Sequence, residues 1–513
     1  MTDDPLASPG ETTDPGASTT STSGTDGLPE QMRVRREKRE QLLAQGVDPY
    51  PVAVPRSHEL SEVVAQYDAE ELGPDHQTGD HVAVTGRVIF LRNTGKLCFA
   101  RLRAGDGTEV QAMFSLADVG EQSLADFKAL VDLGDLIAVQ GEVVTSRRGE
   151  LSVQGVTWQM AAKALRPLPN DHRPLSDEGR VRLRYVDMII RPEARDIVRG
   201  KAAVLRSLRE TLDSQGYVEV ETPTLQLTNG GASARPFRTH LNAFDQDMVL
   251  RIALELDLKK AMVGGVDRVY EIGRTFRNEG IDSTHAAEFS MLEAYQAYGD
   301  YNTIAELNQQ LVVNAARAVG RTVVKGRDGS DIDLEGEWRH ASILDLVSEA
   351  VSQPVTADTP AEVLREYADK HDVVLQPQWG AADILVELYE QLVEETLIQP
   401  TFVRDYPEAA KPLAKGHREI EGLSEAYDLV VNGVELVTAF SEMNDPVVQR
   451  EKLVAQAVQG GDDAMDLDEN FLRALEFGMP PAGGMGMGID RLMMLLWGVG
   501  IRESILFPLL RPE

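Results

Sequence analysis

Two adjacent strand patterns at residues 268–295 set the strongest limit on the fold of this chain, because a charged loop joins them. Side chains of a strand alternate between its two faces. The first pattern leads to Arg277, and the second places Phe289, Glu293 and Tyr295 on one face. A ring, a guanidinium and a carboxylate on one concave surface suit a nucleotide, because the ring can stack on a base and the guanidinium can pair with a phosphate. A half-buried hairpin with a solvated loop is the competing interpretation.

The composition narrows the class of protein. The 513 residues are enough for about two to four domains, and the single cysteine, Cys98, excludes an intrachain disulfide. The net charge of −32 argues against nonspecific coating of nucleic acid, although the basic patch at residues 33–39 could hold RNA locally or could be an ordinary charged helix. There is no apolar run of about 18 residues and no signal pattern, so we expect a cytoplasmic protein without a membrane partner.

Changes of composition divide the chain into expected parts. Residues 80–165 alternate short strand patterns with glycine turns around a helix-like interruption at 116–131, which favours a small OB-type barrel. Such barrels often bind single-stranded nucleic acid, and a purely structural β-domain is the alternative. The expected parts, in chain order, are a disordered tail (1–29), a helical segment (30–79), the barrel (80–165), a linker rich in proline, arginine and aspartate (166–192), and a larger domain (193–513) with a helical insertion away from its main sheet at about 302–400.

A hairpin pattern places two acids together in the larger domain. Residues 432–433, Asn-Gly between β-branched runs, predict a two-residue hairpin. Its register groups Asp428, Val430, Glu435 and Val437 on one face, with the two acids as diagonal neighbours about 7 Å apart. Carboxylates that close repel each other unless a cation lies between them, and Mg²⁺ beside a nucleotide phosphate fits. Two solvated acids on an exposed face are the alternative.

A glycine-rich strand pattern occupies residues 482–491. Gly484, Gly486 and Gly488 recur at every second position, so one strand face lacks side chains and a flat ligand can approach the backbone. The methionines between them face the opposite way, into a core. Arg491 follows where a helix begins, and its cation can contact the ligand. A glycine strand required only for close packing is the alternative.

These segments resemble, in order, the three motifs of class II aminoacyl-tRNA synthetases. The motifs correspond to the helix and strand that end at Pro223, to Phe-Arg-Asn-Glu at residues 276–279, and to the glycine block that ends at Arg491. The barrel narrows the resemblance to the subgroup for aspartate, asparagine and lysine, and residues 230–237 and 440–446 are similar to bacterial lysyl-tRNA synthetases. The resemblance covers residues 30–513. It implies an α+β multidomain fold, with an N-terminal OB-fold β-barrel and a catalytic domain built on an antiparallel sheet flanked by helices.

The resemblance also implies a reaction and a set of site residues. Lysine and ATP form lysyl-adenylate, and the lysyl group passes to the 3′ end of tRNA(Lys). Up to three Mg²⁺ ions per subunit and a homodimer are expected. The implied catalytic residues are Arg277, Glu279 and Arg491; those for ATP are Arg277, Glu279, His285, Phe289, Gly488 and Arg491; those for lysine are Gly231, Glu255, Arg277, Glu293, Tyr295 and Glu442; those for metal are Asp428, Glu435 and Glu442; those for the anticodon are Arg92, Phe99, Gln111 and Glu150.

Several positions depart from the family pattern. Leu254 stands where the family usually has proline, Asp257 replaces an aromatic residue, residues 286–287 are two alanines in the ATP loop, and Thr438 replaces an asparagine. None of these changes removes a charged catalytic group. A lysine-activating paralogue with another acceptor and a catalytically weak tRNA-binding paralogue are the two alternatives. Lysine-dependent exchange between ATP and pyrophosphate would separate them.

Overall fold

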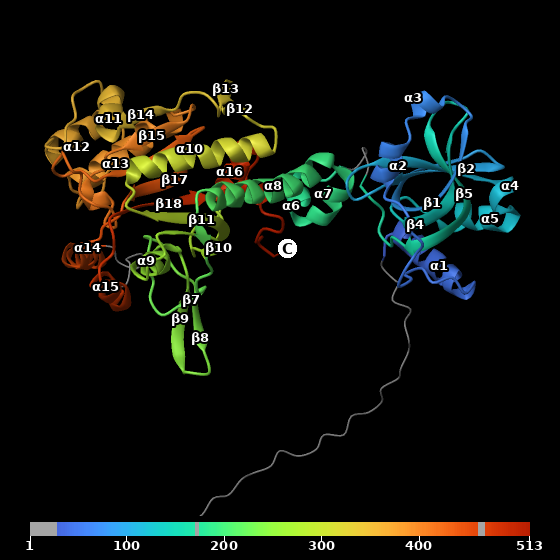
Figure 1. The fold of residues 1–513 in the computed structure, drawn as a ribbon, viewed down its shortest axis with the longest axis horizontal. Coiled ribbons are helices and arrows are strands. Elements are labelled where there is room, and N and C mark those ends of the chain that lie inside the picture. The colour runs from blue at the N-terminus through green and yellow to red at the C-terminus, as the bar shows by residue number, and fades with distance from the viewer. Residues whose placement is uncertain (1–27, 170–173, 460–466, 513) are drawn as a thin grey trace, which may run out of the picture. The chain divides into compact units, whose positions relative to one another are not determined.

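The computed structural model describes residues 28–169, 174–459 and 467–512 (Figure 1). The chain forms two compact units, Met1–Pro174 and Leu175–Glu513. Of the predicted disordered tail, residues 1–27 lie outside the described residues. The charged helix predicted from Glu30 is present as α1 (Glu30–Ala44).

The first unit is built around a closed five-stranded barrel in the order β1-β2-β3-β5-β4, which confirms the predicted OB-type fold. A helical interruption lies between β3 and β4, as the sequence predicts, and the first strand begins three residues before the expected start of the barrel. The elements are α2 (Leu60–Gln66), α3 (Ala69–Leu72), β1 (Gln77–Asn93), β2 (Leu97–Arg103), β3 (Glu109–Ser115), α4 (Leu116–Val119), α5 (Glu121–Leu130), β4 (Leu136–Thr145) and β5 (Leu151–Ala162).

Alternation of side chains builds the core of this barrel. Every second residue of β3 is buried, so Phe114 faces inward, and its ring centroid lies 4.4 Å from that of Phe127 on α5. Gly141 lets β4 and β5 approach closely, because a Cβ at this position would lie 1.9 Å from the carbonyl oxygen of Gln154. The inward-facing apolar residues leave polar side chains on the outer surface of the barrel.

The second unit contains an eight-stranded sheet in the order β14-β15-β16-β17-β18-β11-β10-β6. Its central strands pair antiparallel, and the two edge strands pair in parallel with their neighbours. The bounds are β6 (Val218–Glu219), β10 (Arg268–Phe276), β11 (Glu288–Ala297), β14 (Arg339–Ser342), β15 (Thr401–Arg404), β16 (Ala426–Val431), β17 (Val434–Ser441) and β18 (Ala482–Gly488). This arrangement confirms the predicted antiparallel sheet flanked by helices.

Three helices cover one face of the sheet (Figure 1), namely the long helices α8 (Pro192–Ser214) and α10 (Tyr301–Ala318) and the shorter α16 (Ile489–Trp497). Their apolar residues form one core with Met485 and Met487 of β18, which face away from the glycines as predicted. A smaller core on the other side joins the sheet to α9 (Glu255–Val263) and α15 (Glu469–Leu475). The polar residues of the candidate site lie on that second side.

Short elements complete the second unit. They are α6 (Asp177–Arg182), α7 (Arg184–Ile190), β7 (Leu225–Gln226), β8 (Arg238–Leu241), β9 (Gln246–Leu250), β12 (Val323–Lys325), β13 (Asp331–Asp333), α11 (Ile343–Val351), α12 (Ala361–Lys370), α13 (Ala381–Leu392), η1 (Glu394–Thr396), η2 (Glu408–Ala410), α14 (Pro446–Gln459) and α17 (Ile501–Ser504). In the part of the chain that the structure describes, no helix is both long and apolar enough to cross a membrane.

The predicted linker at residues 166–192 needs correction, because its second half is helical. Both α6 and α7 belong to the second unit. Charged residues suggested a solvated linker, but Arg184 and Asp187 are buried together, with a guanidinium nitrogen 3.3 Å from the carboxylate. Opposite charges that neutralise each other can be packed inside a fold.

The predicted insertion at about residues 302–400 is not separate from the main sheet. Ile304 and Leu311 of α10 are part of the sheet core, and β14 forms one edge of the sheet. Helices α11, α12 and α13 gather beside β15, in a core that includes Val403 (Figure 1). Periodicity identifies such helices but does not tell which surface each of them covers.

The predicted hairpin at residues 432–433 forms with the expected register next to its turn. A β-bulge then shifts the pairing, so that Asp428 lies opposite Thr438 rather than opposite Val437. Val437 is therefore buried in the core, and its predicted position on the same face as Asp428 is wrong. Asp428 and Glu435 do lie near each other, since both raise the pKa of Lys411. A bulge adds one residue to one strand, and alternation alone does not reveal it.

Candidate active site and RNA-binding surface

Four neighbouring strands place a row of residues across the face of the sheet opposite the long helices. Glu293 lies opposite Gly486, and Gly486 lies opposite Thr438. Thr438 in turn lies opposite Asp428. Because the glycine has no side chain, the row is open in its middle and carries an acid at each end. The two ends form the inner pocket (Glu255, Lys259, Glu293, Tyr295 and Glu442) and the outer cluster (Glu390, Glu394, Lys411, Asp428 and Glu435).

Glu293 is buried in the inner pocket and held from two sides. One carboxylate oxygen accepts a hydrogen bond from the backbone N–H of Leu254 and the other accepts from the hydroxyl of Tyr295, both at 2.9 Å. Burial, followed by the negative charge of Glu255, raises the pKa of Glu293 to about 7. A carboxylate that is fixed in place and costly to ionise gains most from a bound cation.

Lys259 lies between the two other acids of the inner pocket. Its ammonium is 2.5 Å from Glu255 and also forms an ion pair with Glu442. Burial raises the pKa of both carboxyl groups. Two of the three buried carboxyls therefore share one buried ammonium, and a bound cation would stabilise the ionised form of the carboxyls. Lys259 was not among the predicted site residues, although a lysine four residues after a glutamate in a helix is a known ion-pair pattern.

The glycines of β18 form the floor between the two parts of the site. A Cβ at Gly484 would lie 2.0 Å from a carboxylate oxygen of Glu442 and 2.4 Å from the ring of Tyr295. A Cβ at Gly486 would meet the methyl end of Met291 at 3.0 Å. The predicted face without side chains is therefore present, and close packing requires the glycine at position 484 in addition to any ligand.

Arg277 follows β10 and stands between the two parts of the site. Its guanidinium carbon is 5.3 Å from the ring centroid of Phe289. Burial is the largest influence and lowers the pKa of Arg277, while the charges of Glu435 and Glu293 act in the opposite direction. An arginine stays protonated under such conditions. One guanidinium is therefore within electrostatic range of acids at both ends of the row.

Arg491 lies in the first turn of α16, three residues after Gly488, where the sequence predicts the start of a helix. Its guanidinium donates to the backbone oxygen of Glu435 at 2.6 Å and lies 3.4 Å from Nε2 of His285. His285 and Glu279 are both exposed on the loop between β10 and β11. The contact with His285 brings this loop to the start of α16, so the residues implied for ATP lie around one opening.

The two acids of the outer cluster that were predicted to bind metal each have a basic partner. The ammonium of Lys411 is 3.0 Å from each carboxylate oxygen of Asp428, and a guanidinium nitrogen of Arg491 is 3.4 Å from Glu435. Burial lowers the pKa of Lys411, but Asp428 and Glu435 raise it more, so the net shift is upward. Lys411 was not among the predicted site residues, because it lies outside all the motifs that point to the site.

The predicted three-residue metal site is not assembled. Among the residues that the structure describes, no three histidine, cysteine, aspartate or glutamate side chains are placed to hold one ion. Glu442 instead pairs with Lys259 in the inner pocket. Two carboxylates still fit a Mg²⁺ ion that arrives with ATP, because Mg²⁺ usually keeps water and phosphate oxygens among its ligands.

Positions that depart from the family pattern also border the site. Leu254 supplies the N–H that binds Glu293, and proline has no such donor. Gly231 has a φ of +87°, and a Cβ there would lie 3.3 Å from the Cβ of Glu255, so its backbone lies beside the inner pocket as predicted. The alanines at 286–287 border a cavity of about 60 Å³ next to the C-terminal segment.

The residues predicted for the anticodon lie on the outside of the barrel. Arg92 is directly opposite Phe99, and its guanidinium carbon is 4.8 Å from the ring centroid. Phe99 is half-buried and does not belong to the barrel core, so the core interpretation of this residue is not supported. Gln111 and Glu150 line one cavity of about 540 Å³ together with Arg101, which is 2.8 Å from Glu150 and which the sequence analysis missed.

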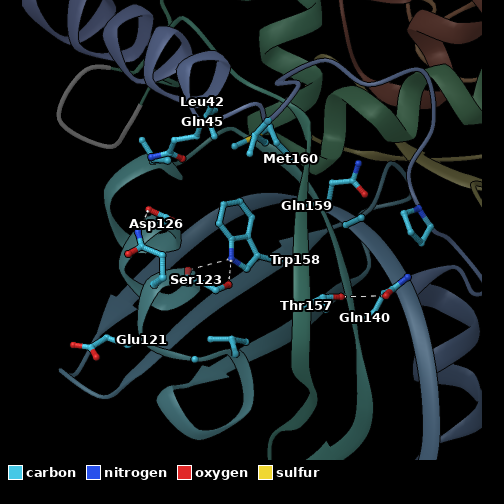
Figure 2. Close-up of a pocket in the computed structure, with 17 residues that line it drawn as sticks. Leu42, Gln45, Glu121, Ser123, Asp126, Gln140, Thr157, Trp158, Gln159 and Met160 are labelled. Carbon is cyan, nitrogen blue, oxygen red and sulfur yellow. Dashed lines mark hydrogen bonds between the residues drawn. The ribbon is translucent and has the colours of Figure 1, made fainter.

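A separate cavity of about 720 Å³ in the first unit is lined by residues of α1, α5, β4 and β5 (Figure 2). Trp158 forms part of its wall, and the indole N–H donates to the hydroxyl of Ser123 at 3.1 Å (Figure 2). Its lining contains Glu121 and Asp126 and none of the predicted RNA-binding residues. The cavity of Gln111 is also lined by acids, namely Asp68, Glu109 and Glu150, but Arg101 adds a positive charge there.

Comparison with known proteins agrees with this geometry. The family described as tRNA synthetases class II (D, K and N) matches residues 176–511, and the family described as OB-fold nucleic acid binding domain matches residues 82–161. The chain is 53% identical to a lysine–tRNA ligase of Mycolicibacterium gilvum, over 96% of this chain and 99% of that protein. It is also 53% identical to a lysine–tRNA ligase of Kineococcus radiotolerans, over 95% and 98%.

One longer relative is matched over less than half of its own length. The chain is 46% identical to the lysylphosphatidylglycerol biosynthesis bifunctional protein LysX of Mycolicibacterium vanbaalenii, over 95% of this chain but 44% of that protein. The lysine–tRNA ligases instead match along nearly their whole length, and both family matches fall on the units that the structure separates. The chain therefore belongs to the lysine–tRNA ligase family of class II aminoacyl-tRNA synthetases.

Proposed function

We propose that this protein activates lysine with ATP and transfers the lysyl group to the 3′ end of tRNA(Lys). The negative charge of the inner pocket is the observation that supports lysine as the amino acid substrate. Glu255 and Glu442 pair with the ammonium of Lys259, whereas the buried Glu293 is not paired with that ammonium, so the acids outnumber the ammonium among these four residues. Lysine brings two ammonium groups, whereas aspartate would need a cation in this position and asparagine would leave the acids unpaired.

Each group of lysine has a partner in this proposal. Glu293 and Tyr295 hold the ε-ammonium, because their oxygens meet at 2.9 Å deep in the pocket. Glu255 and Glu442 hold the α-ammonium, and Arg277 pairs with the carboxylate. A neutral analogue is rejected, because a buried carboxylate without a partner costs about 1–3 kcal/mol or more.

The activation step requires placement and charge neutralisation rather than a protein nucleophile. The lysine carboxylate attacks the α-phosphorus of ATP in line, and pyrophosphate leaves. We assign Arg277 to both the carboxylate and the α-phosphate, and its position within electrostatic range of acids at both ends of the row supports this assignment. Phe289 and Arg491 take the adenine, and Glu279 and His285 lie on the loop beside the phosphates.

The outer cluster offers carboxylate ligands for a magnesium ion. Asp428 and Glu435 would hold the ion that accompanies ATP, and bound Mg²⁺ would neutralise the phosphate oxygens. The number of ions, predicted as up to three per subunit, stays a prediction. The chain itself contributes Lys411 and Arg491, whose positive charges lie at the same carboxylates.

Residues on the outer surface of the barrel support the proposal that an RNA accepts the lysyl group. Arg92 and Phe99 offer a cation and a ring on which a base can stack, and Gln111 and Glu150 offer polar groups that can read a base edge. We assign these four residues to the anticodon of tRNA(Lys). The homodimer and the cytoplasmic location remain predictions from the sequence.

The test is ATP–pyrophosphate exchange with each of the twenty amino acids, followed by charging of tRNA. We expect exchange that depends on lysine and formation of lysyl-tRNA(Lys). Exchange with a different amino acid would contradict the assignment of the pocket. The same exchange with a lysine analogue that lacks the ε-ammonium would contradict it as well.

A second candidate follows from the partial match to the LysX protein, whose name assigns it to lysylphosphatidylglycerol biosynthesis. Lysine activated by this chain would then pass to a different acceptor. Exchange without charging of tRNA would favour this candidate. Tight binding of tRNA without exchange would instead indicate a tRNA-binding paralogue of low catalytic activity.

A further inference from the structure

Lys411 places a positive charge in the middle of the outer cluster. It follows η2, and its ammonium donates to both carboxylate oxygens of Asp428 at 3.0 Å and to the hydroxyl of Thr438 at 3.3 Å. The nitrogen also lies 4.5 Å from the ring centroid of Tyr406. An ammonium has three N–H donors, so these partners can occupy all of them.

Acids from several elements surround this ammonium. Glu390 of α13 and Glu394 of η1 lie within electrostatic range of both Asp428 and Glu435. Burial, followed by the charge of Glu435, raises the pKa of Glu394 to about 7. The carboxyls of the cluster therefore disfavour each other's ionisation, and a cation among them relieves the repulsion.

Both predicted metal ligands form ion pairs with basic side chains of the same protein. Lys411 pairs with Asp428, and Arg491 pairs with Glu435. A further divalent ion at Asp428, besides the one that accompanies ATP, would have to displace the ammonium or accept it as a close neighbour. Either arrangement is unfavourable, because like charges at such distances repel strongly in a partly buried site.

We propose that the ammonium of Lys411 takes the place of one divalent ion beside Asp428, so that ATP binds with one metal ion fewer than the bare carboxylates would recruit. This inference rests on the proposed ATP site. A lysine ammonium is a compact charge with rotatable donors. It can keep its bonds to Asp428 and turn the N–H that now faces Thr438 toward a phosphate oxygen.

The experiment counts the Mn²⁺ ions that each chain binds together with a non-hydrolysable ATP analogue. Mn²⁺ accepts the same oxygen ligands as Mg²⁺, and its electron paramagnetic resonance signal distinguishes free from bound ions. Lys411→Met removes the ammonium, and Lys411→Arg keeps a positive charge. The matched control is Lys415→Met, because Lys415 is an exposed lysine four residues away whose ammonium contacts Asn444 at 2.8 Å.

We expect Lys411→Met to bind one Mn²⁺ more per chain than the wild-type protein, and the other two variants to match the wild type. Equal counts in Lys411→Met and wild type would overturn the inference, and so would an extra ion in Lys411→Arg. Melting temperatures check that each variant is folded. Should the methionine variant unfold, Lys411→Gln, which can still donate to Asp428, takes its place with the same expected count.

Failure of this inference can be told apart from failure of the proposed function. Wild-type protein that exchanges pyrophosphate with lysine but shows equal ion counts across the series refutes only the role of Lys411. Protein that binds the analogue without lysine-dependent exchange refutes the proposed function, whatever the counts are.

Discussion

Replacing Glu293 with glutamine (E293Q) should weaken lysine binding and leave the fold intact. The amide oxygen can still accept from Leu254, and the amide N–H can donate to the hydroxyl of Tyr295, so both 2.9 Å contacts keep a partner. The variant therefore loses the negative charge and little else. A hydrogen bond to a charged group is worth about 1.5–3 kcal/mol, so the KM for lysine should rise about 10- to 150-fold.

The same substitution should change how lysine binding depends on pH. Burial and the charge of Glu255 raise the pKa of Glu293 to about 7. An ammonium favours the ionised carboxylate, so binding releases a proton and becomes tighter as the pH rises through 7. For one such group, the Kd should fall about tenfold between pH 6 and pH 8, and about half a proton should leave at pH 7.

Calorimetric titration of lysine in buffers of different ionisation enthalpy measures the affinity and the proton release together. E293Q should release about half a proton less at pH 7 than the wild type and should show a flatter pH dependence. Burial raises the pKa of Glu442 and the charge of Glu293 adds to this effect, so E293Q should also reduce the proton release of Glu442, which changes the difference in the same direction. Glu288→Gln is the matched control, since Glu288 is an exposed acid on the same strand. Unchanged affinity together with unchanged proton release in E293Q would refute the reasoning.

Three further substitutions test other parts of the site. Arg277→Ala should abolish lysine-dependent pyrophosphate exchange with an unchanged circular dichroism spectrum, and exchange at the wild-type rate would contradict its role. Gly484→Ala should lower the melting temperature more than Gly486→Ala, because its Cβ would lie 2.0 Å from Glu442 while the other meets only a flexible methionine end at 3.0 Å; equal losses would argue against the tight floor. Phe99→Ala should raise the KM for tRNA about 5- to 150-fold, as expected for a lost base stack, without changing exchange; an unchanged KM would remove Phe99 from the RNA surface.

Much of the scaffold could be predicted from the sequence, because alternation within a strand is a local property. The period of two placed Glu293 and Tyr295 on one face of β11 and turned the methionines of β18 into the core, as the structure has them. Predictions that depended on how distant segments pack were less successful. The helix α10 covers the main sheet, and residues 177–190 are helical, although composition suggested an insertion and a linker.

The charge pattern of the site could not be obtained in the same way. Lys259 and Lys411 reach acids on other strands, and their long side chains give no periodic signal at the position where they end. The bulge that turns Val437 inward arises from pairing between two strands, and Glu442 joins the inner pocket because a buried ammonium lies there. Strand faces follow from covalent geometry along the chain, whereas the pairing of charges depends on which segments burial brings together.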